Sequence, residues 1–360
     1  MSRSRNNGRL LEKTKRRSDQ FLNGLTAYES VTLVSHVNPD PDSLASMLGL
    51  AHLVERRLSL PTRMMCDGMI SRAENRAMVE LLDINLIPIE ELERNDADAL
   101  VMVDSQPKTG RHTFDPTHPL YAVIDHHDTP GDLTGVPFVD VRQSMGATCS
   151  VVTSYLLEQE VDIPVRLATA LTYGIETELS GYPRNATPVD DGALLCVYPL
   201  ADKELLAQIR NARLPQNYFE AVLQAMQSTF IYDRLLISWV YDLPAPELAA
   251  EIVDFMIRYE AVDWALCAGV MGQKLILSFR SVKAGAQAGD VLRQVVGNKG
   301  KAGGHDRRAG GYIDLPSASS SAIDEVQSEL RRRLLKALHI DECRGRRLVK
   351  LREMLSNLQS

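Results

Sequence analysis

Residues 31–46 read VTLVSHVNPDPDSLAS, and this stretch indicates the fold class of the chain. The run Val31–Val34 is short, apolar and rich in β-branched residues, which predicts a buried strand. Pro39 and Pro41 exclude a regular helix immediately after it. Residues 44–53 are then apolar at helical spacing, so a helix is expected next. A strand, a loop and a helix in this order are typical of an α/β sheet.

Three side chains on the loop of this stretch suit a divalent cation. His36, Asp40 and Asp42 would lie at the carboxyl end of a strand, where open α/β sheets bind their ligands. An imidazole followed by carboxylates four and six positions later favours manganese or magnesium. The alternative is that the two aspartates only form a turn and that His36 is a strand-end histidine.

Two more apolar runs end in residues of the same types. Ala99–Val103 leads directly into Asp104-Ser105, and Tyr121–Ile124 leads into Asp125-His126-His127-Asp128. Each run predicts a buried strand. Because the carboxyl ends of parallel strands meet at one edge of a sheet, the three clusters should lie close together. The sequence therefore predicts a metal site at this edge.

The remaining elements of this region alternate in type. Thr62–Cys66 is expected to form a strand and Glu90–Asp98 an acidic helix. Helices are also expected at Ala147–Glu158 and Val165–Ile175, the second being apolar nearly all round. This second helix should open into Glu176-Thr177-Glu178 and a polar loop. A carboxylate there would supply a further ligand, unless the two glutamates are a surface acidic pair.

Residues 190–230 are expected to be helical, and a second, smaller α/β unit is expected from Glu247. The pattern of this unit predicts, in order, a helix from Glu247, a hairpin of 261–270 and 274–281, and a helix at 290–296. Residues 297–311, GNKGKAGGHDRRAGG, are expected to form a glycine-rich loop. Adjacent glycines allow a ligand close to the backbone, and His305, Arg307 and Arg308 suit an anion such as phosphate.

These elements give a domain scheme and a fold class. We expect a basic N-terminal helix (1–28), a catalytic α/β domain (29–190), a helical linker (191–245), a substrate-binding domain (246–316) and a helical tail (317–360). The first domain should be a doubly wound, mostly parallel sheet, with the active site in the cleft between it and the smaller C-terminal α/β domain. Arg331–Ser360 reads as a charged helix, and assembly into a homodimer stays open. The buried face of the N-terminal helix is expected to comprise Leu10, Leu11, Phe21, Leu22 and Leu25.

Composition narrows the classes of protein and partner. The chain has 360 residues, of which 44% are hydrophobic and 24% charged, as in globular proteins with a full core. A formal charge of −7 argues against charge-driven binding to long duplex nucleic acid. No long apolar run predicts a membrane span or signal peptide. The five scattered cysteines suggest neither disulfides nor a thiolate zinc site, and a cytoplasmic location is expected.

Five short motifs in a fixed order resemble the DHH phosphoesterase family. They are HVNPDPD, VDS, DHH, an acid at a helix end after GIET, and AGGH, spread over roughly residues 28–315. The two-domain arrangement is similar to that of the nano-RNases that also dephosphorylate 3′-phosphoadenosine 5′-phosphate. The resemblance implies two manganese ions in the first domain, with magnesium or cobalt as alternatives. It also implies a DHH-associated domain whose glycine–histidine loop closes over the substrate.

The resemblance assigns the metal ligands to two ions. His36 and Asp40 would hold the first ion, Asp42 and His126 the second, and Asp104 would bridge them. The fourth motif of the family usually supplies an aspartate, whereas this chain has Glu178. Glutamate is one methylene longer and still able to ligate a metal, although it would reposition the second ion.

The remaining roles follow from the same resemblance. His127 would contact the scissile phosphate or protonate the leaving oxygen, and Asp125 would orient the histidine pair. The other end of the substrate would bind in the second domain to Arg280, Gly303, Gly304, His305 and Arg308. Ala302 departs from the three glycines that often precede this histidine, and would tighten the pocket.

The function expected from the sequence is metal-dependent hydrolysis of phosphate esters. A water activated by two metals would attack short oligoribonucleotides, linear dinucleotides or phosphorylated nucleotides, and no protein nucleophile is needed. Two alternatives stay open. One is hydrolysis of polyphosphate, pyrophosphate or a cyclic dinucleotide at the same site. The other is a nucleotide sensor that has lost turnover.

Overall fold

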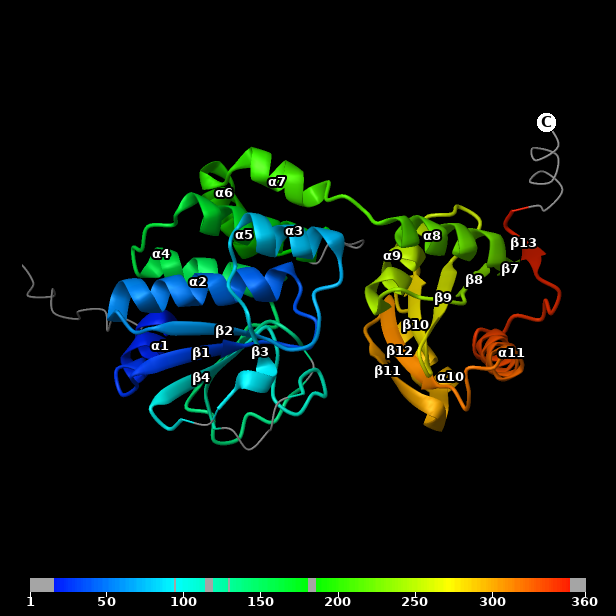
Figure 1. Cartoon of the computed structure of the whole chain (residues 1–360), viewed down its shortest axis with the longest axis horizontal. Coiled ribbons are helices and arrows are strands. Elements are labelled where there is room, and N and C mark those ends of the chain that lie inside the picture. Colours follow the sequence, from blue (N-terminus) through cyan, green and yellow to red (C-terminus); the bar gives the residue numbers. More distant parts are fainter. Residues whose placement is uncertain (1–15, 94, 114–118, 129, 181–185, 350–360) are drawn as a thin grey trace, which may run out of the picture. The chain divides into compact units, whose positions relative to one another are not determined.

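The chain forms two compact units, residues 1–212 and 213–360. Their coordinates come from a computed structural model that describes residues 16–93, 95–113, 119–128, 130–180 and 186–349 (Figure 1). Leu10 and Leu11, expected on the buried face of the first helix, lie outside the described residues. Each unit has its own sheet and its own core, and each is described separately below.

The first unit is built on a six-stranded parallel sheet of order β3-β2-β1-β4-β5-β6 (Figure 1). Its strands are β1 (Ser30–Val34), β2 (Thr62–Cys66), β3 (Ile87–Pro88), β4 (Asp98–Val103), β5 (Leu120–Asp125) and β6 (Phe138–Val141). The chain runs outward from β1 to β3 and then returns to place β4 on the other side of β1. The order of strands therefore reverses between β1 and β4, and the predicted α/β fold with a parallel sheet is confirmed.

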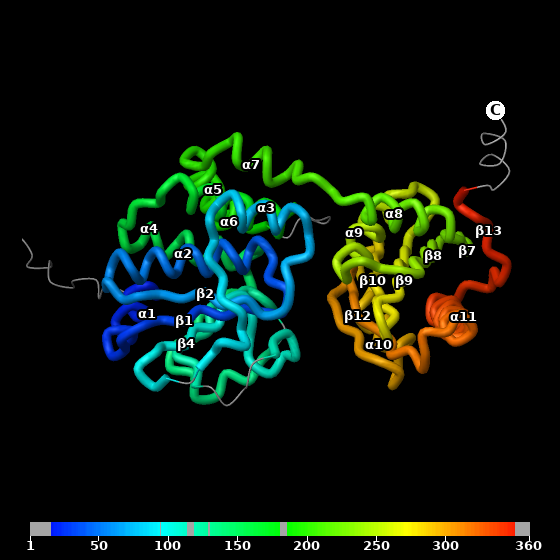
Figure 2. The backbone as a smooth tube through the Cα atoms, viewed as in Figure 1, coloured from blue at the N-terminus to red at the C-terminus, as the bar shows by residue number. Residues whose placement is uncertain are grey.

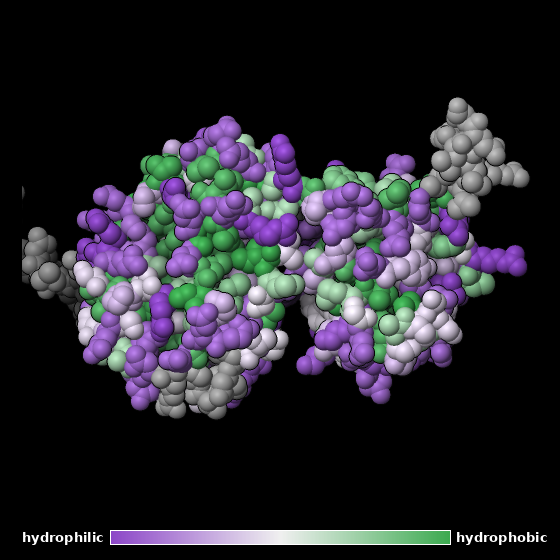
Figure 3. Space-filling view, viewed as in Figure 1, coloured by the Kyte–Doolittle hydropathy of each residue, from purple (hydrophilic) through white to green (hydrophobic). Residues whose placement is uncertain are grey.

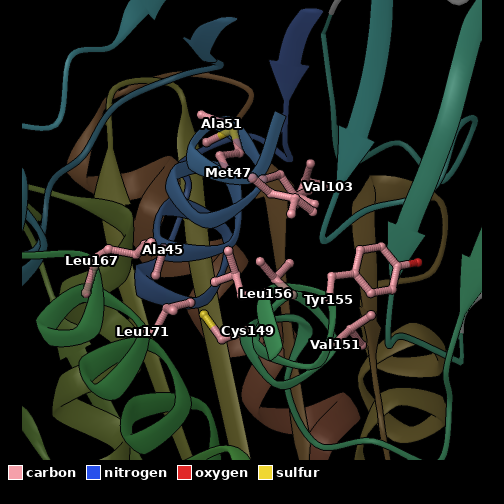
Figure 4. Packing of buried hydrophobic residues seen from close by; sticks show 14 of the residues in the cluster. Ala45, Met47, Ala51, Val103, Cys149, Val151, Tyr155, Leu156, Leu167 and Leu171 are labelled. Carbon is pink, nitrogen blue, oxygen red and sulfur yellow. The ribbon is translucent and has the colours of Figure 1, made fainter. Parts of the chain in front are cut away.

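Helices cover one face of this sheet. They are α1 (Arg17–Leu25), α2 (Pro41–Leu58), α3 (Ala73–Leu81), α4 (Thr148–Glu158), α5 (Val165–Leu179), α6 (Pro188–Val197) and α7 (Lys203–Arg210), with a short 3-10 turn, η2 (Tyr198–Leu200). Alternate strand residues such as Leu33 and Val103 pack beneath α2 and α4, where Met47 and Leu156 are fully buried (Figure 4). The opposite face, including Met102, lies under the loop that carries Ile89 and Leu92.

Two expectations for the first unit are wrong in detail. Residues 90–98 do not form a helix, because only the turn η1 (Ile89–Glu91) is helical and Asp98 already belongs to β4. After Leu92 this segment offers only the small Ala97 to bury a helix face, and the Asp98 carboxylate accepts hydrogen bonds from the Ser30 and Thr32 hydroxyls. Helix α5 also continues past Ile175, because buried Leu179 extends its apolar face.

The second unit has a mixed seven-stranded sheet of order β11-β12-β10-β9-β8-β7-β13, in which only the β8–β9 pair is parallel among the described residues. Helices α10 and α11 cover one face, and α8 and α9 cover the other (Figure 2). The helices are α8 (Gln216–Ser228), α9 (Pro246–Met256), α10 (Ala288–Val296) and α11 (Ser320–Ala337). The strands are β7 (Phe230–Tyr232), β8 (Leu235–Val240), β9 (Trp264–Met271), β10 (Lys274–Ser281), β11 (Gly300–Gly304), β12 (Arg308–Asp314) and β13 (Arg346–Arg347).

The stretch expected as a glycine-rich loop, residues 297–311, instead forms a β-hairpin. After a short 3-10 turn, η3 (Gly297–Lys299), strands β11 and β12 pair antiparallel through partners such as Gly303 and Gly310. The propensity of glycine disfavours a strand, but α10 packs closely against β11. A Cβ at Gly289 of α10 would lie 2.4 Å from the carbonyl oxygen of Gly304, so tertiary packing requires glycine there.

The C-terminal helix also differs from its expected range. A charged helix was expected at Arg331–Ser360, whereas α11 spans Ser320–Ala337 and residues 350–360 lie outside the described residues. The side chain of Ser319 caps its start by accepting a hydrogen bond from the backbone N–H of Ala322.

Hydrophilic and apolar residues are interspersed on the face shown in Figure 3. No helix within the described ranges is both long and apolar enough to cross a membrane.

Candidate metal centre

The loops after β1 and β4 meet at the point where the strand order reverses. Val34 pairs with Met102, so the residues that follow these two strands begin side by side. Asp104 has a φ of 56°, a left-handed conformation that turns the chain immediately after β4. Its backbone N–H donates to the carbonyl oxygen of Ile124, 2.9 Å away, which ties this turn to β5. This edge is where parallel α/β sheets bind their ligands.

His36 presents a lone pair to two carboxylates. Its Nδ1 lies 2.9 Å from the carbonyl oxygen of Val37, which can only accept, so Nδ1 carries the proton. Its Nε2 lies 3.6 Å from Asp40 Oδ2 and 3.5 Å from Asp104 Oδ2. This nitrogen is buried and has no hydrogen-bond partner among the described residues. Burial opposes protonation, but the Asp104 and Asp40 carboxylates raise the pKa of His36 to about 10.

Asp40 and Asp42 lie at the beginning of α2. Asp40 is its N-cap, and its Oδ1 accepts from the backbone N–H of Ser43 at 3.0 Å. Asp42 accepts from the first two amides of α4, those of Thr148 and Cys149, at 2.8 and 2.7 Å. These hydrogen bonds fix its carboxylate at the N-terminus of a helix. Even so, burial and the charge of Asp104 raise the pKa of Asp42 well above its usual range.

His126 repeats the arrangement of His36 on the other side of Asp104. Its Nδ1 lies 3.3 Å from the carbonyl oxygen of Met145. Its Nε2 lies 3.6 Å from Asp104 Oδ1 and 3.8 Å from Asp42 Oδ2. Asp104 thus has one oxygen facing each imidazole, and the Thr148 hydroxyl donates to Oδ1 at 2.7 Å. Metal-binding histidines commonly donate their second ring N–H to a backbone carbonyl in this way.

The donor set fits divalent cations. Ligand atoms of His36, Asp40 and Asp104 lie within 4.8 Å of one another, and so do those of Asp104, His126 and His127. Like-charged carboxylates crowd together where burial disfavours charge, and a buried imidazole nitrogen, Nε2 of His36, has no hydrogen-bond partner among the described residues. A cation would compensate both features. Imidazole together with carboxylate oxygen suits ions such as manganese.

His127 and Asp125 form a separate pair beside this cluster. His127 Nδ1 donates to Asp125 Oδ1 at 2.8 Å, so this nitrogen has no lone pair to offer a metal. Asp125 is fully buried, and its other oxygen accepts from Gln106 Nε2 at 2.8 Å. Although burial opposes it, the hydrogen bond from His127 lowers the pKa of Asp125. Geometry therefore separates the two histidines, since His126 directs a lone pair at the carboxylates and His127 does not.

Glu178 lies in the last turn of α5, near the cluster but outside its tightest groups. Its side chain is exposed, yet the surrounding protein and the Asp40 charge raise the pKa of its carboxyl. The other acids of this region are engaged elsewhere. Glu176 pairs with Arg210, and Asp190 accepts from the backbone of Gly146 and Thr187 to cap α6. The charges of the metal cluster thus act on Glu178.

In the second unit, several predicted substrate-binding residues line one cavity. It has a volume of about 400 Å³, and its walls include Arg280, Gly304, Arg308 and Ser278. Arg280 and Arg308 are partners across the β10–β12 pair. Arg280 also forms an ion pair with Asp254, with Nε 2.6 Å from Oδ1. Gly303 lies in β11 and His305 in the following turn, and neither residue lines this cavity.

Sequence reasoning missed two contributors to the site. The first contributor is the pair of backbone amides of Thr148 and Cys149, which bind Asp42. The sequence predicts a helix that begins within one residue of this position, but not its contact with Asp42. Gln106 was also missed, although it directly follows Asp104-Ser105 in the sequence. Neither contributor is a typical metal-ligand residue type, and their contacts depend on how three loops pack together.

Comparison with known families agrees with this geometry. Residues 30–175 match the family model described as DHH family, N-terminal domain. The match covers less than half of the chain and includes every proposed ligand of the first unit except Glu178. The first unit is thus similar to the N-terminal domain of that family over its sheet and helices α2 and α4.

Two individual proteins extend the comparison. An uncharacterized protein of Methanocaldococcus jannaschii is 27% identical over 316 residues, which are 86% of this chain and 64% of that protein. The chain thus spans less than two thirds of this relative. The crystal structure of an exopolyphosphatase-related protein from Bacteroides fragilis matches with a TM-score of 0.71 and 15% identity, covering 91% of this chain and 100% of that chain. At this identity the likeness concerns the fold alone.

Proposed function

We propose that this protein is a manganese-dependent phosphoesterase that hydrolyses short oligoribonucleotides or phosphorylated nucleotides. One observation carries the proposal. The Nε2 atoms of His36 and His126 face the two oxygens of buried Asp104 at the carboxyl edge of a parallel sheet. The match of residues 30–175 to the DHH family supports the same reading.

The ligands would divide around Asp104. His36 and Asp40 would hold one ion, His126 and Asp42 the other, and Asp104 would contribute to both, with Glu178 as a further ligand. When bound, such ions supply an activated water and offset the negative charge of a phosphate. The chain prepares the site by fixing both imidazole rings through Nδ1 and the Asp42 carboxylate through two helix amides.

His127 is the residue proposed to act on the substrate itself. Because Nδ1 donates to Asp125, Nε2 is the ring nitrogen left to contact the scissile phosphate or to pass a proton to the leaving oxygen. The side chain is 18% exposed, which leaves it accessible from solvent. The hydrogen bond from Nδ1 to Asp125 fixes the orientation of this ring.

The second unit is proposed to hold the remainder of the substrate. Its cavity combines the guanidinium groups of Arg280 and Arg308 with the glycine backbone of the hairpin. Arginine forms charge-assisted hydrogen bonds with phosphate, and glycine allows close approach to a ligand. His305 and Gly303 are proposed to contribute at the adjoining turn and strand.

The experiment is a panel of substrates with added manganese. Release of product from a linear diribonucleotide, from 3′-phosphoadenosine 5′-phosphate, from pyrophosphate and from a cyclic dinucleotide would be measured with and without a chelator. The proposal predicts turnover of the first two that is lost on chelation. Turnover of pyrophosphate alone would favour the inorganic alternative. Tight nucleotide binding without any turnover would favour a sensor.

A further inference from the structure

Gln106 joins two loops at the carboxyl edge of the first sheet. It follows β4 and is only 3% exposed. Its Nε2 donates to Asp125 Oδ2 at 2.8 Å and to the carbonyl oxygen of His127 at 3.1 Å. Its Oε1 accepts from the backbone N–H of Gly131 at 2.9 Å. One side chain thus binds the loop after β4 to the end of β5 and to two points of the loop that follows β5.

The orientation of this amide follows from its partners. The backbone N–H of Gly131 can only donate, so the atom of Gln106 that faces it must be the oxygen. The amide nitrogen then faces Asp125, and only a donor satisfies that carboxylate. A carboxylate or an apolar group in place of the amide could not satisfy Gly131 and Asp125 together.

Asp125 connects Gln106 to His127. It is fully buried, and its two oxygens accept from different neighbours, Oδ2 from Gln106 and Oδ1 from the ring of His127. A buried carboxylate that loses one of its donors will change its conformation to regain one. Rotation of Asp125 would remove the hydrogen bond that fixes the His127 ring. Gln106 also holds the backbone oxygen of His127, so the ring and its main chain depend on the same amide.

We propose that Gln106 is a positioning residue, which holds the Asp125–His127 pair so that Nε2 of His127 points at the reacting phosphate. The inference rests on the proposed function for its kinetic consequence, but the geometry it describes is independent of activity. It assigns no metal ligand to Gln106, whose loss should leave manganese binding intact. The competing explanation is that Gln106 only satisfies buried polar groups and contributes to stability.

The experiment uses Gln106→Leu with Gln159→Leu as a matched control. Gln159 is also buried in the first unit and also donates Nε2 to a carboxylate, that of Asp19 at 2.7 Å, but on α1 rather than at the site. The first measurement is the NMR signal of the His127 Nδ1 proton in histidine-labelled protein. It should be protected from exchange with solvent in the wild type and in Gln159→Leu, and lost in Gln106→Leu.

The second measurement is kinetic. In Gln106→Leu, kcat on a diribonucleotide should fall about 10- to 100-fold, as for other residues that orient a functional group, with KM and manganese content within about twofold of wild type. A 4-nitrophenyl ester of the same nucleotide needs less help for its leaving group and should lose less. Gln159→Leu should match the wild type in both assays.

The outcomes separate the two hypotheses. An unchanged His127 signal in Gln106→Leu, or equal kinetic losses in the two leucine variants, would overturn the role of Gln106. A wild-type protein that hydrolyses no phosphate ester would refute the proposed function, and the NMR comparison would still decide the role of Gln106. If Gln106→Leu does not fold, Gln106→Met keeps the length of the side chain but can neither donate to Asp125 nor accept from Gly131. It should show the same loss of signal.

Discussion

The carboxyl edge of the first sheet and the glycine-rich hairpin of the second unit are built in opposite ways. At the first, buried titratable side chains such as His36 and Asp42 are fixed by hydrogen bonds to the backbone and to helix amides. At the second, the wall includes three glycines and two arginines. The first arrangement suits metal ions, whose ligands must converge from fixed positions. The second suits a phosphate or nucleotide approached by amides and charge.

The largest effect is expected from Asp104→Ala, which tests whether the first region is a metal site. This carboxylate faces both histidines, so its removal should abolish manganese binding and lower kcat/KM by about three orders of magnitude, or about 4 kcal/mol of transition-state stabilisation. Metal analysis after gel filtration, together with diribonucleotide kinetics, checks this. The control is Asp290→Ala, because Asp290 lies on the exposed side of α10. Activity near that of the wild type in Asp104→Ala would exclude the two-metal assignment.

Glu178 tests where this metal site ends. Glu178→Ala should reduce activity roughly 10- to 100-fold, as loss of a peripheral ligand does, whereas Glu178→Asp should retain most of it and change the preferred metal. The measurement is activity titrated with manganese, magnesium and cobalt. Glu176→Ala is the matched control, because Glu176 lies on the same turn and pairs with Arg210. Equal effects of the two alanine variants would place the ligand elsewhere.

The hairpin region should respond in another kinetic parameter. Arg308→Ala should raise KM for a diribonucleotide about tenfold through loss of a charge-assisted contact, with manganese content unchanged. His305→Ala should act in the same direction. Arg293→Ala serves as the control, since Arg293 is ion-paired with Asp290 on the exposed side of α10. Loss of a manganese ion in His305→Ala would show that this histidine is a ligand, and the division between the regions would fail.

The same contrast explains what the sequence could predict. The run before His36 and the runs before Asp104 and Asp125 all form parallel strands, because apolar β-branched runs and the ligand-type residues that end them are local features. The pattern predicts a loop where the hairpin forms, because glycine at Gly300 and Gly311 is required by the close approach of β11 and β12 and not by local propensity. Gln106 escaped notice for a related reason, since its three partners come from a distant loop.

A smaller effect concerns acid stability, which should differ between the units. Asp263, in the second unit, forms an ion pair with Arg234, 2.5 Å from Nε to Oδ2, and a second with Lys283. The hydrogen bond from Arg234 lowers the pKa of Asp263 to about 2 from its usual 3.8. A lowered carboxyl pKa stabilises the fold above pH 3.8, and this contribution is lost as the pH falls towards 2.

Asp263→Asn should therefore destabilise the second unit by about 1 kcal/mol at pH 7, a value discounted because Arg234 and Lys283 are half exposed. The difference from wild type should shrink as the pH falls below 3.8 and be nearly absent at pH 2. Urea unfolding of the full chain, followed by the fluorescence of Trp239 and Trp264, reports on this unit because both tryptophans lie in its sheet. The control is Asp324→Asn, because Asp324 lies at an exposed position of α11. A difference that stays constant from pH 7 to pH 2 would mean that Asp263 contributes through packing rather than charge.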